Sequence, residues 1–501
     1  MKKLLCATFD SLDATVVEVE STLTKGLPSF SIVGIASTSI SESKERVKSA
    51  LLSNEFKFPP KRITINLSPS DLSKSGSHFD LSIALLIALD AKEIDLQDIF
   101  VFGELGLDGA VKENTLLFSL VLSLANKGLI SKAIVPFEAL AKLSKIPNIA
   151  LIGVKTLNEA IEVLTTATAF PSLKSSELEF KYLEFNSEKY YYSENYELDF
   201  SDVKGQEVAK RAALISACGM HNLLLEGTPG CGKSMIAKRL PFILPPMSLN
   251  EILHSSMLES MQSIEPTFSP SRPYKAPHHS ATLASVFGGG SKKAQIGEVG
   301  LAHNGILFFD EIPHFAKSVL EALREPLEDK KIRVSRVHSK IEYDASFLFI
   351  GAMNPCPCGN LLSQELTCHC SELEIKRYKS RLSDPFLDRM DLIIQMQSVR
   401  SEDRATLTSK KMHKIVLEVF SITKSRGQSV LNGLLCDSDI EKYCLLDEDA
   451  QNILDMAIGK FALSFRSINK IKKVSRTIAD INNSKTINKT DVLEALSYRK
   501  R

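Results

Sequence analysis

The chain has 501 residues, of which 44% are apolar, and its 61 Lys and Arg against 60 Asp and Glu give a formal charge of +1. These ordinary values exclude a disordered chain, a collagen-like chain and a nucleic-acid binder that is basic throughout, and the length favours about three domains. The charge is uneven, because residues 460–501 hold eleven Lys or Arg and three Asp or Glu, a local +8. The other 459 residues therefore carry −7.

The N-terminal sequence and the apolar runs argue against export and membrane insertion. The opening MKKLLCATFD turns polar too early for a signal peptide. The richest apolar runs, 81–89 and 116–125, are shorter than the roughly 18 residues needed to span a bilayer. Nine cysteines, an odd number, suit a reducing compartment. We expect a cytoplasmic protein with no membrane partner.

The first 165 residues alternate strand and helix patterns, which predicts an α/β or α+β domain. The predicted strands cover 14–19, 62–67 and 130–136, and the predicted helices 40–52, 80–89 and 116–126. From 171 to 200 the sequence is polar and Tyr-rich without a clear period, which predicts a linker with at most one extended segment. A second α/β unit begins near residue 202 and ends near 398, and the remainder has a helical pattern.

A phosphate-binding loop follows the predicted strand NLLLE (222–226). The eight residues GTPGCGKS fit G-x-x-x-x-G-K-[ST] at every fixed position, and a helical run, MIAKRL, comes next. In such a loop, backbone N–H groups and the start of the helix face the phosphates. We expect Lys233 between the β- and γ-phosphates and Ser234 on Mg²⁺. The predicted ATP-binding residues are Gly227, Thr228, Pro229, Gly230, Cys231, Gly232, Lys233 and Ser234.

A second predicted strand, GILFF (305–309), ends in two acidic residues. Asp310 is expected to hold the Mg²⁺ shell through water, and Glu311 to orient and polarise the attacking water. Alone, the pattern could be a buried strand that happens to end in exposed acids. Beside the phosphate loop it indicates an ATPase that uses ATP and Mg²⁺.

Eight further segments occur in the order typical of one protein family. They are GLPSFSIVG (26–34), KRITINLSPSDL (61–72), FDLSIAL (79–85), DVKGQEVAKRA (202–212), RPYKAPHHSATLASVFGGG (272–290), GAMNPCPCG (351–359), RLSDPFLDRMD (381–391) and SFRSINKIKKVSRTIADI (464–481). Together with the two nucleotide motifs they cover almost the whole chain. The sequence resembles the bacterial ComM/YifB family of magnesium-chelatase-like AAA+ ATPases.

This resemblance implies a domain order and a set of further site residues. The implied parts are a Lon-protease-like α/β domain of the ribosomal protein S5 domain 2-like fold (1–168), a linker (169–200), a P-loop AAA+ core (201–398) and a helical lid (399–501). Asn354 would sense the γ-phosphate, Arg389 would be the arginine finger acting on a neighbouring subunit, with Arg381 as the runner-up, and Arg466 would be the second sensor. Some positive residues of the lid, Arg466 and Lys470 among them, should then face nucleotide. The family assembles as hexameric rings.

The N-terminal domain departs from the protease it resembles. His78 stands where the nucleophilic Ser should be, and the position of the catalytic Lys falls near Phe118. Ser82 and Lys127 have a suggestive spacing, but Ser82 lies within an apolar helix pattern and Lys127 at the end of the next helix. A Ser without its base is not activated, so we expect no peptidase activity.

Residues 330–340, KKIRVSRVHSK, carry five Lys or Arg and no acid, and their alternation predicts a hairpin. In ring motors of this type such hairpins point into the central pore, where basic residues suit a phosphate backbone. The candidate DNA-binding residues are Lys330, Lys331, Arg333 and Arg336. A solvated hairpin is the alternative.

Four cysteines form two C-x-C motifs that are separated by nine residues. Cys356, Cys358, Cys368 and Cys370 could hold a tetrahedral structural Zn²⁺, with His369 as an alternative ligand. The usual spacing is C-x₂-C, so a loop of reduced thiols remains the other interpretation.

Three functions fit these features. The first is an ATP-driven hexameric motor on single-stranded or branched DNA, which the family resemblance links to branch migration in recombination and natural transformation. The second is a chelatase-type or protein-remodelling AAA+ ATPase that acts on a protein partner. The third, a regulatory scaffold with little turnover, is disfavoured by the intact Glu311.

Overall fold

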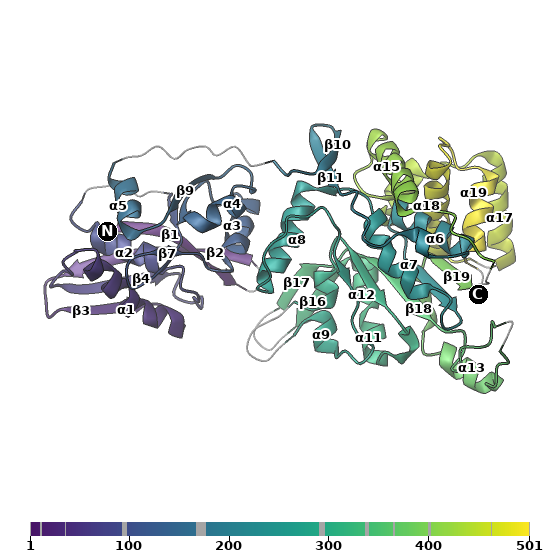
Figure 1. Cartoon of the computed structure of the whole chain (residues 1–501), viewed down its shortest axis with the longest axis horizontal. Coiled ribbons are helices and arrows are strands. Elements are labelled where there is room, and N and C mark those ends of the chain that lie inside the picture. Colours follow the sequence, from purple (N-terminus) through teal and green to yellow (C-terminus); the bar gives the residue numbers. More distant parts are fainter. Residues whose placement is uncertain are drawn as a thin grey trace. The chain divides into compact units, whose positions relative to one another are not determined.

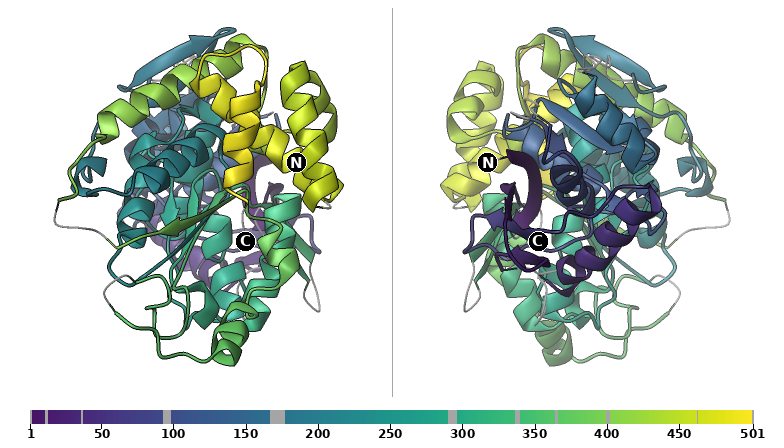
Figure 2. Two further views of the ribbon diagram at one scale, coloured as in Figure 1. Left: turned by 90° about the vertical axis from the view of Figure 1, so that its right-hand side faces the viewer. Right: turned by 90° about the vertical axis from the view of Figure 1, so that its left-hand side faces the viewer.

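The computed structural model divides the chain into two units (Figure 1; Figure 2). The first comprises residues 1–179 and 256–268, and the second 180–255 and 269–501. The residues that the structure describes are 2–10, 13–35, 37–92, 98–166, 177–289, 296–335, 340–363, 366–398, 402–461 and 463–499.

The first unit is built on a seven-stranded mixed sheet of order β3-β4-β2-β1-β5-β8-β9. Its strands are β1 (Lys2–Asp10), β2 (Asp13–Thr24), β3 (Ser29–Val33), β4 (Arg62–Ser68), β5 (Phe100–Val101), β8 (Lys132–Pro136) and β9 (Ala150–Val154). The main helices are α1 (Thr38–Ser53), α2 (Asp80–Ala88), α3 (Leu117–Asn126), α4 (Leu140–Leu143) and α5 (Leu157–Thr165), and a small ribbon joins β6 (Glu104–Leu105) to β7 (Val111–Lys112). The six elements predicted in this region are confirmed. α2 is buried on every side, and apolar residues accordingly occur on all of its faces.

The residues that mark the protease-like turn are enclosed in this unit. Ser82 is buried on α2, and its hydroxyl donates to the Phe79 carbonyl oxygen at 2.8 Å. His78 is also buried, and burial lowers its pKa to about 4, so the imidazole is neutral near pH 7. Lys127 instead donates to the Ala14 carbonyl at 3.2 Å.

The second unit contains a five-stranded sheet of order β14-β15-β18-β12-β19, in which every pairing is parallel. Its strands are β12 (Leu223–Gly227), β14 (Tyr274–Lys275), β15 (Ile306–Phe309), β18 (Leu348–Met353) and β19 (Leu392–Met396). β12, β15 and β18 are buried along their whole length. Strands covered on both faces have continuous apolar sequences, which is why 222–226 and 305–309 are recognisable from the sequence.

Helices and a hairpin surround this sheet. They are α6 (Glu207–Gly219), α7 (Lys233–Arg239), α9 (Leu283–Phe287), α10 (Glu298–Leu301), α11 (Lys317–Ala322), α12 (Arg324–Asp329), the hairpin β16 (Lys331–Ser335) and β17 (Lys340–Asp344), α13 (Glu372–Lys379) and α14 (Asp384–Leu387). α8 (Leu249–Met261) begins in the second unit, and its last residues are assigned to the first.

Part of the predicted linker is ordered. β10 (Lys181–Phe185) and β11 (Glu188–Tyr192) form a hairpin that pairs with β13 (Met247–Ser248). Tyr190 is buried, and its ring lies 5.1 Å from the ring of Phe420 in edge-to-face contact. Tyr190 is thus a packing residue, a role that depends on a partner 230 positions away and leaves no local pattern.

The C-terminal helices share one core with the sheet and form no separate unit. They are α15 (Ser409–Ser425), α16 (Asp437–Tyr443), α17 (Glu448–Phe461), α18 (Phe465–Ile481) and α19 (Lys489–Ser497). Asp480 on α18 is buried between two guanidinium groups, at 2.8 Å from Arg426 and 2.9 Å from Arg476. Asn432 donates a further hydrogen bond to its carboxylate at 2.8 Å. No helix among the described residues is long and apolar enough to cross a membrane.

Replacing Asp480 by Ala should lower the free energy of unfolding by about 3–5 kcal/mol, because the buried Arg476 and the partly buried Arg426 would lose their counter-ion. Urea unfolding followed by circular dichroism measures this. Glu418→Ala on α15, which removes an exposed pair with Lys414, is the matched control and should cost less than about 0.5 kcal/mol. Equal losses in the two variants would contradict the role of the buried network.

The first unit should not cleave peptide bonds, because the Ser82 hydroxyl is enclosed and already bonded to a backbone carbonyl. Incubation with casein, followed by gel electrophoresis with and without ATP, should leave the substrate intact. Cleavage that disappears in Ser82→Ala would overturn this expectation.

Candidate nucleotide site and its surroundings

The predicted nucleotide-binding residues follow three adjacent strands of the parallel sheet. The phosphate loop follows β12, Asp310 and Glu311 follow β15, and Asn354 follows β18. Because the order is β15-β18-β12, these three strand ends lie side by side at the carboxyl edge of the sheet. Crevices at that edge are the usual ligand sites of parallel sheets.

Lys233 connects the phosphate loop to Asn354. Its Nζ donates to the carbonyl oxygens of Gly227 and Thr228 at 2.7 and 2.9 Å and to Asn354 Oδ1 at 3.1 Å. Burial lowers the pKa of this ammonium group from its ordinary value. The loop carbonyls and Asn354 therefore place a cation where a polyphosphate would need one.

Ser234 and Asp310 form the second contact across the site. Ser234 Oγ donates to Asp310 Oδ2 at 2.7 Å. A hydroxyl and a carboxylate are the oxygen ligands that Mg²⁺ prefers, so this pair fits a magnesium ion bound with nucleotide. Glu311 follows with φ of +49°, a left-handed conformation uncommon for a residue with a side chain. Strained backbone of this kind is concentrated at functional sites.

Two glycines of the loop are required by geometry. Gly232 caps α7 with φ of +100°. A Cβ on Gly227 would lie 2.7 Å from Cys231 Sγ and 2.9 Å from the Met396 carbonyl on β19. The loop can therefore turn tightly against β19 only without side chains at these points.

Arg389 and Arg466 share one carboxylate partner, away from the phosphate loop of their own chain. Both guanidinium groups pair with Glu328 on α12. The Arg389 carbonyl accepts a hydrogen bond at 3.0 Å from Asn222, the residue before β12, whereas the phosphate loop follows the other end of that strand. That Arg466 and Lys470 face nucleotide stays a prediction; in this chain Lys470 pairs with Asp391 at 3.0 Å. Arg381, the runner-up finger, donates to the Pro313 carbonyl at 2.7 Å, two residues beyond Glu311.

The predicted basic hairpin exists, but carboxylates offset its positive charge. Lys331 and Arg333 on β16 pair with Glu342 on β17 at 2.6 and 2.9 Å. Lys330 lies at the end of α12, where its Nζ donates to the Leu327 carbonyl and burial lowers its pKa to about 8. The DNA contact of Lys330 stays a prediction, although its ammonium group is bonded to the Leu327 carbonyl here. Arg336 lies outside the described residues.

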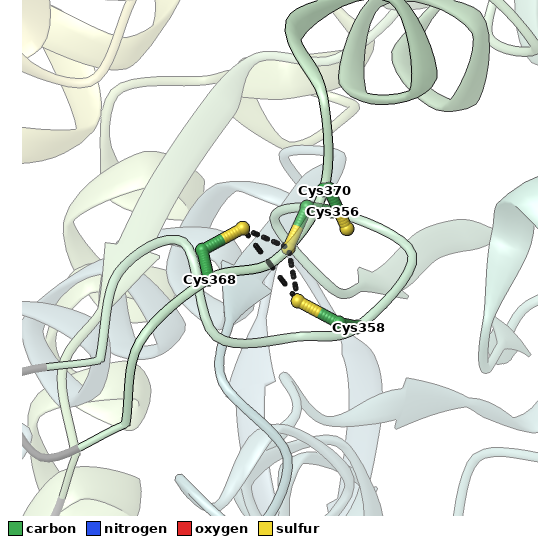
Figure 3. Close-up of side chains that lie close together, drawn as sticks. All are labelled: Cys356, Cys358, Cys368 and Cys370. Carbon is green, nitrogen blue, oxygen red and sulfur yellow. Dashed lines mark hydrogen bonds between the residues drawn. The ribbon is translucent and has the colours of Figure 1, made fainter.

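The four cysteines converge into one cluster (Figure 3). The Sγ atom of Cys356 lies 3.4 Å from that of Cys358 and 3.7 Å from that of Cys368, and the latter two are 3.6 Å apart. All four sulfurs lie within 4.8 Å of one another. A tetrahedron of Zn–S bonds of about 2.3 Å has S···S edges of about 3.8 Å, so the thiols fit a zinc ion.

Three side chains at the site, those of Ser398, Tyr378 and His279, were not among the predicted site residues. Thr228 and Ser398 approach through their hydroxyl groups at 3.3 Å. Burial raises the pKa of Tyr378, whose hydroxyl contacts the backbone of Asn354, to about 12. His279 Nδ1 lies 3.9 Å from Glu311 Oε2. Only the His278–His279 doublet was visible in the sequence, and nothing there linked it to Glu311.

Comparison with known proteins agrees with this geometry. Residues 199–404 match the family model described as magnesium chelatase, subunit ChlI, residues 19–139 match subunit ChlI of Mg-chelatase, and residues 406–499 match its C-terminal model. The chain is 36% identical to competence protein ComM of Haemophilus influenzae over 97% of this chain and 95% of the relative. YifB of Salmonella typhimurium is also 36% identical, over the same shares. The magnesium-chelatase 67 kDa subunit of Heliobacterium mobile is 23% identical over 47% of this chain and 41% of its own length. The chain therefore belongs to the ComM/YifB family of magnesium-chelatase-like AAA+ ATPases.

Proposed function

We propose that this protein is a cytoplasmic, ATP-driven motor that acts as a hexameric ring on single-stranded or branched DNA and moves branch points during recombination. The observation that carries the proposal is the convergence of Lys233, Ser234, Asp310, Glu311 and Asn354 at one sheet edge. These residues supply a phosphate-binding cation, magnesium ligands, a water-orienting carboxylate and a polar sensor.

The ring is supported by the position of the two arginines. Arg389 and Arg466 lie together on Glu328 near the amino-terminal end of β12. A strand of five residues is about 16 Å long, so neither guanidinium group contacts the phosphate loop of its own chain. In a ring, the same surface would face the nucleotide of a neighbouring copy, where a cation stabilises the charge of the transition state.

DNA as the substrate is supported by the hairpin and by one relative. The segment SRVHSK (335–340), between β16 and β17 in the sequence, adds two cations and a histidine with no acid. A relative at 36% identity is named a competence protein, which links the family to DNA uptake and hence to natural transformation.

One observation favours a second candidate, a remodeller that acts on a protein partner. Lys331 and Arg333 are paired with Glu342, and Arg333 also lies within 4 Å of Glu325 and Asp329. A hairpin with balanced charge suits a polypeptide as well as a phosphate backbone. The response of ATP turnover to DNA separates the two candidates.

We also propose that the cysteine cluster binds one structural Zn²⁺. The cluster follows Asn354 directly, and Gly359 within it has φ of +81° and packs so tightly on the phosphate loop that a Cβ would lie 2.6 Å from Pro229 Cδ. A metal that fixes residues 356–370 would therefore hold both Asn354 and the phosphate loop in place. The ion would be closed off by its four ligands and take no part in hydrolysis.

ATP turnover should rise when single-stranded or forked DNA is added, and a forked DNA with annealed arms should be resolved. Lys233→Ala should abolish ATP binding, and Glu311→Gln should bind ATP but turn over at least about a hundredfold more slowly, because the water loses its general base. Lys238→Ala, at an exposed position of the same helix, is the matched control and should retain binding. A phosphate-release assay and fluorescence-monitored strand separation measure these effects.

If DNA neither raises turnover nor is resolved, the motor proposal fails and the protein-remodelling candidate stands. Glu311→Gln with ATP should also form rings visible by electron microscopy. A monomer under those conditions would contradict the ring.

Protein purified without chelator should contain about one equivalent of zinc by plasma mass spectrometry. Exchanging Cys368 and Cys370 for Ser together should remove it and weaken ATP binding, because the loop behind Pro229 would loosen. Cys436→Ser, an exposed cysteine outside the cluster, should change neither quantity. Less than half an equivalent in the unmodified protein would exclude the site.

A further inference from the structure

We propose that Tyr378 and Lys379, the last two residues of α13, are positioning residues for ATP hydrolysis. Tyr378 fixes the place of Asn354, and Lys379 neutralises the carboxylate of Glu226, which stands directly before the phosphate loop. This inference rests on the proposed ATP-driven function and assigns to it two neighbouring residues with different kinetic effects.

α13 can deliver these side chains to the site because its first turn is fixed. Ser371 caps the helix by accepting the Glu374 N–H, and the Glu374 carboxylate accepts the Ser371 N–H at 2.8 Å in return. Such a reciprocal cap defines where a helix begins, and α13 then continues for eight residues to Lys379. Adjacent helical residues point about 100° apart, so Tyr378 and Lys379 reach different partners.

The end of α13 contacts all three strands that carry the nucleotide site, or the segments that follow them. The Tyr378 hydroxyl forms a hydrogen bond with the backbone of Asn354, which follows β18. Lys379 Nζ lies 2.8 Å from Oε1 of Glu226, on β12. Arg381, just beyond the helix, bonds to a carbonyl of the segment after β15. One stretch of four residues therefore joins three strand ends that are far apart in sequence.

Tyr378 acts on the predicted sensor. Its ring is buried and lies 6.2 Å from the ring of His314 in edge-to-face contact, so its hydroxyl group has a fixed position. The Asn354 backbone is bonded to that hydroxyl, and Asn354 Oδ1 accepts a hydrogen bond from Lys233 Nζ at 3.1 Å. The hydroxyl of Tyr378 thus sets where the amide of Asn354 lies relative to the phosphate-binding lysine.

Lys379 compensates a carboxylate that is almost enclosed. The Glu226 side chain is 10% exposed, and its other oxygen accepts a hydrogen bond at 3.2 Å from Gln395, its register partner on β19. Glu226 directly precedes Gly227, whose carbonyl oxygen accepts from Lys233. Charges with little water around them are weakly screened, so an unpaired carboxylate here would repel the polyphosphate. The Lys379 ammonium group removes that repulsion.

The charge role is tested by titration with a fluorescent ATP analogue. Lys379→Met should weaken ATP affinity about three- to tenfold, because the Glu226 carboxylate loses its counter-ion, with kcat nearly unchanged. The double variant Lys379→Met/Glu226→Gln should recover the affinity of the unmodified protein, since neither charge remains. Lys376→Met, at an exposed position one turn earlier on α13, is the matched control and should bind ATP normally. Full affinity in Lys379→Met, or no recovery in the double variant, would overturn this role.

The sensor role is tested by Tyr378→Phe, which removes the hydroxyl group and keeps the buried ring. Its kcat should fall about two- to tenfold, the factor that corresponds to one hydrogen bond, while KM for ATP stays nearly unchanged. Steady-state phosphate release at varied ATP concentration measures both constants. An unchanged kcat, or a loss confined to KM, would overturn the role of Tyr378.

These outcomes also separate the inference from the function on which it rests. If the unmodified protein binds no ATP, the proposed function fails and both roles fail with it. If it binds and hydrolyses ATP but the variants behave as the unmodified protein does, only the roles of Tyr378 and Lys379 fail. DNA is absent from every measurement, so the result does not depend on whether the motor acts on DNA or on a protein.

Discussion

The parallel order β15-β18-β12 is the constraint on which the site depends. Parallel strands end at the same edge, so three short polar segments that are far apart in sequence become neighbours there. The acidic pair after β15, the amide after β18 and the loop after β12 then complete one another, as the contact between Lys233 and Asn354 shows. The cysteine cluster and the His279 loop extend from the ends of β18 and β14, so they border the same edge.

The opposite edge of the sheet holds two candidate arginines. Arg389 and Arg466, drawn together by Glu328, lie where the strands begin and not where they end. A single chain therefore places its phosphate-binding residues and its two candidate arginines at different edges of one sheet. Under the proposed function, in which hydrolysis uses both sets, a second copy would supply the arginines, and a closed ring would meet this need for every copy at once.

The sequence predicted those features that depend on local pattern. Buried parallel strands are apolar along their length, and a phosphate loop needs glycines at fixed spacing, so β12, β15, α7 and the ATP-site residues could be identified directly. Features that depend on long-range contacts could not. Glu342 neutralises Lys331 and Arg333 only because of the hairpin register, Tyr190 packs on Phe420, and Lys330 caps α12. The contact between His279 and Glu311 spans 32 positions and two different strand ends, so no spacing rule indicates it.

The basic C-terminal segment, residues 460–501, is partly neutralised by carboxylates of its own unit. The segment carries a net charge of +8, and three of its eleven positive residues pair with carboxylates of the same unit: Arg466 with Glu328, Lys470 with Asp391 and Arg476 with Asp480. Such pairs stabilise the helices against the sheet and leave less charge to attract phosphates. On β16 the positive side chains are balanced in the same way by Glu342. If the proposed attraction to DNA exists, it must be concentrated in few residues, and the sequence 335–340, which has two cations and no acid, is the segment that the proposal favours.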